Sequence, residues 1–167
     1  MIEVRLLVPD DWKTWRELRL NALEEAAYAF GSRLADWQGD GDREERWRAR
    51  LDIAGQHLVA ALDRRPVGIA SGVPTDDDGV AELISMWVHP AARGEGVGDE
   101  LIRAVELWAR STGAGVLRLT VMDGNATASA LYVRNGFRYT GERGDVLADG
   151  RRELVMVKPL PPAAGAG

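Results

Sequence analysis

The most informative absence in this sequence is cysteine, which occurs nowhere in the chain. Without a thiol the protein has no disulfide bond, no thiolate metal site and no cysteine nucleophile. Histidine is scarce as well, since His57 and His89 are the only two in the sequence. We therefore expect no metal centre, and any group transfer has to proceed without a cysteine intermediate.

Long apolar runs and an excess of basic residues are also missing. No apolar stretch approaches the roughly 20 residues that a membrane-spanning helix needs, and the N-terminal MIEVRLLVPDDW lacks the basic-then-apolar layout of a secretory signal. Lysine and arginine number 21 against 26 aspartate and glutamate residues, a formal net charge of −5, which gives no nucleic-acid-binding footprint. We expect a cytoplasmic protein that binds neither membranes nor nucleic acids.

What the chain does contain is enough apolar sequence for one core. Its 167 residues are 46% hydrophobic, which suits a single globular domain. We expect this domain to span residues 1–160 and to be followed by a flexible tail at 161–167, where the sequence is reduced to proline, alanine and glycine.

Two amphipathic helices are expected in the first third of the chain. Residues 2–8 alternate as a strand, and the Pro-Asp-Asp that follows ends the strand and offers a cap for the first helix. The second helix begins where Asp42 and Glu45 have the spacing of a capping box. Helical spacing places the following residues on the apolar faces of these two helices: Trp12, Trp15, Leu18, Ala22, Trp47, Leu51 and Ala54.

The rest of the chain predicts a meander followed by alternating helices and strands. Strands at 57–63 and 66–73 are joined by a tight turn at Arg64-Arg65, and a third strand at 81–90 completes the meander. The elements expected after it are a helix at 98–112, a strand at 115–121, a helix at 126–135 and strands at 137–144 and 153–160. The fold class is α/β, with a mixed, mostly antiparallel central sheet flanked by helices.

Three glycines, Gly94, Gly96 and Gly98, stand between an expected strand and an expected helix. The first backbone N–H groups of a helix have no partner within the helix, so a loop without side chains at this point favours an anion such as phosphate. A Walker loop would end in lysine, and a dinucleotide fingerprint would have glycine where Asp99 stands, so neither pattern fits. A tight turn without a ligand is the alternative, although one or two glycines would serve it.

A third pattern, Arg/Gln-x-x-Gly-x-Gly/Ala, is matched by residues 93–98 at every specified position. A second segment follows downstream, Asn125-x-x-Ala128-x-x-Leu131-Tyr132-x-x-x-Gly136-Phe137. With both segments in this order, the chain resembles the GNAT superfamily of acyl-CoA-dependent N-acyltransferases over about residues 2–160. The resemblance implies a single-domain GNAT-like fold.

The resemblance also implies a role for each matching residue. Backbone amides of residues 93–98 would bind the pyrophosphate of acetyl-CoA, a backbone N–H near Val88 would stabilise the oxyanion, and Tyr132 would donate a proton to the leaving thiolate. Glu82 is the first candidate for the base, acting through water. The cofactor-binding residues implied in this way are Trp87, Val88, Arg93, Gly94, Glu95, Gly96, Val97, Gly98, Asn125 and Tyr132.

Several of these residues have a structural alternative. Tyr132 would also suit the packed face of an amphipathic helix, and Glu82 would also suit a solvent-facing strand start. In the family the connector between the first two helices often lines the acceptor pocket, so Tyr28, Phe30 and Trp37 are expected either there or in the core.

The function implied is direct transfer of acetyl from acetyl-CoA to a small-molecule or peptide amine, and the lack of cysteine agrees with direct attack. The alternative is a non-catalytic acyl-CoA-binding or regulatory module, which would not need Tyr132.

Homodimers are common in such folds, so the resemblance leaves a homodimer open. Acidic residues suggest attraction of cationic amines, or alternatively soluble loops; they are Glu24, Glu25, Asp36, Asp40, Asp42 and Asp76–Asp78.

Overall fold

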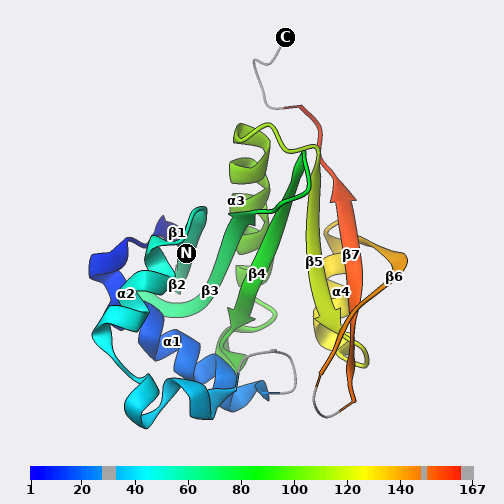
Figure 1. Ribbon diagram of the computed structural model, residues 1–167. Coiled ribbons are helices and arrows are strands. Elements are labelled where there is room, and N and C mark those ends of the chain that lie inside the picture. Colours follow the sequence, from blue (N-terminus) through cyan, green and yellow to red (C-terminus); the bar gives the residue numbers. More distant parts are fainter. Residues whose placement is uncertain (28–32, 148–149, 163–167) are drawn as a thin grey trace.

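The chain folds into a layered structure in which one twisted sheet separates two groups of helices (Figure 1). The structure is a computed structural model that describes residues 1–27, 33–147 and 150–162. Its strands are β1 (Ile2–Leu6), β2 (Gln56–Leu62), β3 (Arg65–Pro74), β4 (Val80–Val88), β5 (Val116–Met122), β6 (Arg138–Val146) and β7 (Arg152–Pro159). Its α-helices are α1 (Trp12–Glu25), α2 (Glu44–Asp52), α3 (Val97–Ser111) and α4 (Ala126–Arg134).

The described strands follow the order β1-β2-β3-β4-β5-β7-β6 in a single sheet. All neighbouring strands are antiparallel except β4 and β5, which are parallel. The α/β class and the mixed, mostly antiparallel sheet expected from the sequence are therefore confirmed. The tight turn between β2 and β3 lies at Asp63 and Arg64, both with positive φ, one residue earlier than the sequence suggested.

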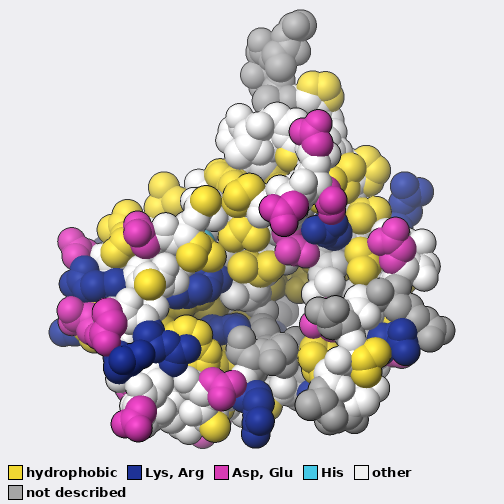
Figure 2. All heavy atoms as spheres, viewed as in Figure 1, with side chains coloured by type: hydrophobic (Ala, Val, Ile, Leu, Met, Phe, Trp, Pro, Cys, Tyr) yellow, Lys and Arg dark blue, Asp and Glu magenta, His cyan; other side chains and the backbone are white. Residues whose placement is uncertain are grey.

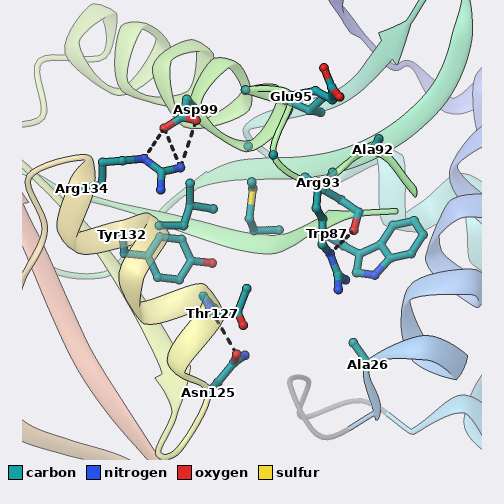
Figure 3. A pocket seen from close by; sticks show the side chains of 18 residues that line it. Ala26, Trp87, Ala92, Arg93, Glu95, Asp99, Asn125, Thr127, Tyr132 and Arg134 are labelled. Atoms are coloured by element: carbon teal, nitrogen blue, oxygen red, sulfur yellow. Dashed lines mark hydrogen bonds and ion pairs between the residues drawn. The ribbon is translucent and has the colours of Figure 1, made fainter. Parts of the chain in front are cut away.

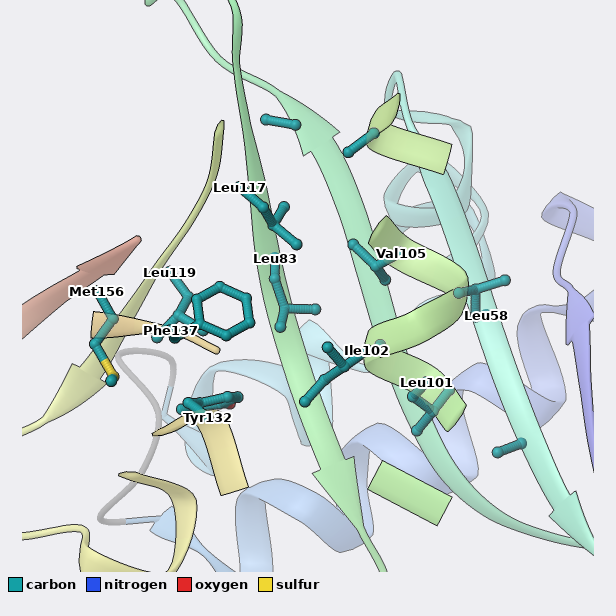
Figure 4. Packing of buried hydrophobic residues seen from close by; sticks show 14 of the residues in the cluster. Leu58, Leu83, Leu101, Ile102, Val105, Leu117, Leu119, Tyr132, Phe137 and Met156 are labelled. Atoms are coloured by element: carbon teal, nitrogen blue, oxygen red, sulfur yellow. The ribbon is translucent and has the colours of Figure 1, made fainter. Parts of the chain in front are cut away.

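Alternating side chains of the sheet feed two hydrophobic clusters, one on each face. Leu58 and Ala70 pack with α3 and α4, whereas their strand neighbours Val59 and Ile69 pack with α1 and α2. The cluster on the α3–α4 side is shown in Figure 4, where Ile102 and Val105 of α3 face the strands. Central strands of this kind are buried on both faces, which is why their sequences are nearly continuous apolar runs.

The capping box expected at the start of α2 is wrong. The helix begins at Glu44 with Arg43 as its N-cap, and no side chain caps it. The carboxylate of Asp42 instead accepts hydrogen bonds from Arg16 Nε, at 2.7 Å, and from Trp47 Nε1, at 2.8 Å. The Asp42 carboxylate binds the charged Arg16 of α1 and not a backbone N–H of α2, since charge-assisted hydrogen bonds are the stronger ones.

The apolar faces expected for the first two helices are largely confirmed. Trp15 and Trp47 are fully buried, and Trp12 packs against the same cluster. Ala54 is exposed beyond the end of α2, so its expected place on the helix face is wrong. Trp37 lies in a short 3₁₀ turn and packs on Trp47, with ring centroids 4.6 Å apart, which is core packing. Tyr28 and Phe30 lie outside the described residues.

Strands β4 and β5 separate along their length, and this separation creates the site. They are paired only at Val80–Glu82 and Val116–Arg118, although both strands continue well beyond these residues. On its other edge β4 contains a bulge opposite β3, where Ser85 has φ of +55°. A bulge bends its strand and adds twist, so β4 stays attached to β3 and diverges from β5 (Figure 1).

Candidate active site

The opening between the diverging strands continues into a pocket of about 700 Å³. The walls come from the end of β4, the loop before α3, the first turn of α3 and the inner face of α4 (Figure 3). The lining residues are Ala26, Met86, Trp87, Val88, Ala92, Arg93, Gly94, Glu95, Gly96, Val97, Gly98, Asp99, Asn125, Thr127, Ala128, Leu131, Tyr132 and Arg134. All ten residues to which the sequence assigned cofactor binding are among them. In the space-filling view the same side of the molecule is hollowed between the two halves of the sheet (Figure 2).

The loop before α3 presents free backbone donors to this pocket. Gly96 is the N-cap of α3 in the left-handed region, with φ of +89°, and no side chain caps the helix. Among the described residues, none accepts a hydrogen bond from the backbone N–H groups of residues 94–98. Several unpaired N–H groups at a helix N-terminus form a site for an anion.

Glycine is required at positions 94, 96 and 98 for two different structural reasons. Gly94 and Gly96 both have positive φ, and a Cβ on Gly94 would meet no atom within 4 Å. A Cβ on Gly98 would lie 3.0 Å from Leu131 Cδ2 and 3.3 Å from Met86 Cε. Gly94 and Gly96 therefore serve the path of the backbone, while Gly98 lets α3 approach α4 and β4.

Arg93 begins this loop, and its guanidinium contacts protein groups. Its Nε donates to the carbonyl oxygen of Val88 at 3.0 Å, and its Nη2 donates to Glu25 Oε2 at 2.9 Å. The same Glu25 oxygen accepts from Trp87 Nε1 at 2.9 Å. Burial raises the pKa of the Glu25 carboxyl, but the hydrogen bonds from Trp87 and Arg93 outweigh burial and lower it overall. Glu25 is thus an ionised anchor that ties α1 to β4 and to the loop.

Val88 offers a backbone donor toward the gap between the strands. The N–H of His89 donates to the carbonyl of Val67 on β3, and Val88 stands opposite Gly68. Since backbone groups alternate between the two edges of an antiparallel strand, the N–H of Val88 points away from β3. It therefore faces the side on which β5 has separated from β4.

Tyr132 lies on α4 with its hydroxyl directed toward the pocket (Figure 3). Its side chain is 7% exposed and packs edge-on against Phe137, with ring centroids 5.9 Å apart. Burial raises the pKa of the Tyr132 hydroxyl above its ordinary value. The hydroxyl is therefore protonated at neutral pH, which is the state that a proton donor requires.

Asn125 has a local role that the sequence did not reveal. It is the N-cap of α4, and its side-chain oxygen accepts from the backbone N–H of Ala128 at 3.3 Å. The opposite, C-terminal end of α4 is tied to α3, because Arg134 and Asn135 both donate to the carboxylate of Asp99. The bonds from Arg134 are the main reason that the pKa of Asp99 is lowered.

Glu82 is the one sequence-derived site residue that does not line the pocket. It lies on the paired segment of β4, beside Arg118 of β5, with 3.6 Å between Glu82 Oε1 and Arg118 Nε. Arg118 also contacts Asp77, at 2.7 Å. The structure therefore brings Tyr132 and the glycine loop together but leaves Glu82 at the closed end of the diverging strands.

Sequence reasoning missed the parts of the site that depend on tertiary contacts. Glu25 appeared only as one of many acidic residues, and nothing in its spacing connects it with Arg93. Thr127, Leu131 and Arg134 lie within the second motif at i, i+4 and i+7, so a helical wheel could have placed Thr127 and Arg134 on one face with Leu131. Among the described residues there is no cluster of histidine, aspartate and glutamate that could hold a metal ion. Within the same residues, no helix combines the length and apolar character needed to cross a membrane.

This fold, with its diverging strands and glycine loop, defines the chain as a GNAT-type acyltransferase. Residues 12–137 match the model of the acetyltransferase (GNAT) family, and the chain belongs to that family. The chain is 35% identical to the IAA acetyltransferase of Azospirillum brasilense over 112 residues. This match covers 67% of this chain and 71% of the relative.

Two further comparisons concern a longer relative and a solved structure with the same fold. Over 159 residues it is 33% identical to the mycothiol acetyltransferase of Salinispora arenicola, covering 92% of this chain but only 49% of that protein. Among solved structures, the PaiA N-acetyltransferase of Thermoplasma acidophilum in complex with coenzyme A superposes with a TM-score of 0.71. That match has 20% sequence identity and covers 95% of this chain and 99% of the other.

Proposed function

We propose that this acyltransferase moves an acetyl group from acetyl-CoA directly to the amine of a small molecule or peptide, within a ternary complex. The observation that carries the proposal is the convergence on one pocket of free loop amides, a protonated Tyr132 hydroxyl and a strand-edge N–H at Val88. These groups suit, in that order, a phosphate, a leaving thiolate and a developing oxyanion.

The loop at residues 94–98 is the proposed pyrophosphate site. Its amides are free, the positive end of the α3 dipole lies there, and Gly98 leaves room beside Leu131. The coenzyme A bound by the Thermoplasma acidophilum structure supports the same ligand here. Arg93 contributes by holding the loop against β4 and α1, because its donors already contact Val88 and Glu25. Asn125 shapes the opposite wall by fixing the start of α4.

The pantetheine arm would lie between the diverging strands, along the free edge of β4 that ends at Trp87 and Val88. An extended, amide-containing chain pairs with an exposed strand edge through backbone hydrogen bonds. This position brings the thioester close to both the Val88 N–H and the Tyr132 hydroxyl. The reaction therefore needs no residue from outside the pocket for oxyanion stabilisation or protonation of sulfur.

The proposed transfer consists of attack by the amine, departure of the thiolate and two proton transfers. The amine nitrogen forms a bond to the thioester carbonyl carbon while the Val88 N–H stabilises the charge on oxygen. The carbon–sulfur bond then breaks, and the Tyr132 hydroxyl gives its proton to the sulfur. The amine loses its proton to a water molecule. Glu82 is the proposed base that receives the proton from this water. Tyr132 recovers a proton from solvent as the products leave.

A second candidate is a module that binds acyl-CoA without catalysis. It would use the same loop and would not require a buried hydroxyl that points into the pocket. The orientation and protonation of Tyr132 favour the enzyme. A cytoplasmic location remains part of the proposal, and a homodimer remains a prediction.

Two-substrate kinetics test the proposal. Purified protein is incubated with acetyl-CoA and a panel of amines, thiol release is followed, and the acetylated product is identified by mass spectrometry. Direct transfer predicts intersecting double-reciprocal lines and no acetylated protein after incubation with acetyl-CoA alone. Parallel lines together with an acetylated protein would instead show a covalent intermediate.

A further inference from the structure

A partly buried arginine, Arg50 of α2, lies against the bulge of β4 on the face opposite α3. Its Nη2 donates to Ser85 Oγ at 3.1 Å and to Ser71 Oγ at 3.2 Å. Its guanidinium lies over the ring of Trp15, with Cζ 4.7 Å from the ring centroid. Ser85 directly precedes the strand segment that lines the pocket, so Arg50 lies immediately behind the site.

The remaining contact of Arg50 is with a neutral histidine. Nη1 of Arg50 is 3.2 Å from His57 Nδ1, and His57 Nε2 is 3.0 Å from the carbonyl of Ile53. A carbonyl only accepts, so Nε2 carries the hydrogen and Nδ1 is the acceptor. Burial lowers the pKa of His57, which keeps its ring uncharged at neutral pH.

The groups that contact Arg50 are therefore neutral and do not balance its positive charge. No carboxylate among the described residues forms an ion pair with Arg50. Burial lowers the pKa of Arg50 to about 10, which still leaves its guanidinium charged at neutral pH. Trp15 Nε1 is also buried, and it donates to no acceptor in the part of the chain that the structure describes.

The acidic residues around the site do not balance this charge. Glu25, Asp42 and Asp77 each form an ion pair with an arginine other than Arg50. The sequence-based expectation that acidic residues attract a cationic acceptor is thus weakened at these three positions. Removing a charged arginine from water costs free energy even where it is partly buried, and an anion from a ligand would offset this cost where the protein partners are neutral.

We infer that the acceptor carries a carboxylate a few bonds from its reactive amine, and that Arg50 binds this carboxylate. The inference rests on the proposed acetyl transfer and adds the substrate class. If the α3–α4 side of the pocket holds acetyl-CoA, the α1–α2 side of β4 is left for the acceptor. The three residue-to-residue steps from Ser85 to Val88 span about 10 Å, a distance that a short amino acid can bridge between guanidinium and thioester. Nε and one hydrogen on Nη1 of Arg50 donate to no residue that the structure describes, which leaves two donors for a carboxylate.

The test compares amino acids with their carboxamides, which keep the amine but lack the negative charge. We expect wild-type protein to acetylate at least some amino acids with kcat/KM roughly 30-fold or more above the matching amides, the lower end of the cost of removing one member of a hydrogen-bonded charged pair. Arg50→Met should abolish this preference through a higher KM for the amino acid. The KM for acetyl-CoA should change less than twofold, and Arg50→Lys should restore part of the preference.

Arg48→Met is the matched control, because Arg48 lies on the same helix and its ion pairs with Asp10 and Glu44 are at the surface. This variant should retain the acid-over-amide preference. If Arg50 merely holds Ser85 in place, Arg50→Met will instead lower kcat equally for acids and amides. That result, or equal use of both acceptors by the wild type, overturns the inference.

Binding provides a readout that does not depend on turnover or on the variant folding. Calorimetry of wild-type protein loaded with coenzyme A uses N-acetylated amino acids and their amides as product probes. Selective binding of the carboxylates supports the inference, whereas equal binding, or none, overturns it. Failure of every amine to be acetylated would count against the proposed transfer, and the calorimetric comparison would still decide whether the carboxylate site exists.

Discussion

The guanidinium of Arg93 donates to the carboxylate of Glu25 across 2.9 Å, joining the end of α1 to the loop that precedes α3. The two residues are 68 positions apart in the chain. Because Arg93 also donates to the Val88 carbonyl, one side chain connects the end of α1, the end of β4 and the proposed phosphate loop. The loop amides are thus positioned before any ligand binds.

This brace predicts coupling between the two residues. Glu25→Gln and Arg93→Gln should each weaken coenzyme A binding roughly twofold to fivefold, the range for partly exposed charged pairs. The double variant should bind coenzyme A with an affinity no lower than that of the weaker-binding single variant, since either change breaks the same contact. Calorimetry with coenzyme A measures the cycle, and Glu24→Gln is the neighbouring control. Fully additive losses would show that the residues act separately.

Gly96 permits a second comparison, in which backbone strain is separated from ligand binding. Gly96 and Gly113 have the same φ of +89°, one in the proposed phosphate loop and the other after the end of α3. Valine at either position should cost about 1–3 kcal/mol of stability through the unfavourable φ. Only Gly96→Val should abolish coenzyme A binding in protein that remains folded by circular dichroism. Unchanged affinity in folded Gly96→Val would disprove the loop as the phosphate site.

The proposed base has a matched control in the structure, because Arg118 contacts both Glu82 and Asp77. If Glu82 accepts the proton of the amine through water, Glu82→Gln should lower kcat/KM chiefly at low pH, where fewer amines are deprotonated. Asp77→Asn disturbs the same arginine and should leave the pH profile unchanged. Identical profiles for both variants and the wild type would remove Glu82 from the mechanism.

Asp42 predicts a pH dependence of stability. Hydrogen bonds from Arg16 and Trp47 lower the pKa of Asp42 to about 2 in the folded protein, from an ordinary value of 3.8. The ionised carboxylate therefore stabilises the fold above about pH 4, and this contribution is lost as the pH falls through about 2. Asp42→Asn should lose about 1 kcal/mol at pH 7 and less at pH 2, measured by urea unfolding. Asp40→Asn is the control, and an equal loss at both pH values would contradict the assignment.

The sequence predicted the parts of the site that are local. The order of the elements, the glycine loop and the helix carrying Tyr132 were accessible because each depends on residues close together in the chain. The divergence of β4 from β5 depends on where the pairing of the two strands stops, which no local sequence pattern shows. The bulge at Ser85 that accompanies it has no signal in composition or periodicity.

Contacts between distant residues were not predictable in the same way. The capping box at Asp42 failed because its carboxylate binds Arg16, 26 residues away. Glu25 and Arg50 were equally hidden, since charged residues on helices are usually exposed. Pairing across the tertiary structure decides which acidic residues are neutralised, and a count of charges along the chain does not contain that information.

Amine-dependent thiol release by the wild type and by Tyr132→Phe tests the central claim most directly. Phenylalanine keeps the ring contact with Phe137 and removes the hydroxyl, so coenzyme A should bind with nearly unchanged affinity while kcat falls roughly 10²- to 10⁴-fold. Tyr139→Phe, at a half-exposed position on β6, should behave as the wild type. Equal turnover by Tyr132→Phe, or coenzyme A binding by the wild type without thiol release for any amine, would contradict the account.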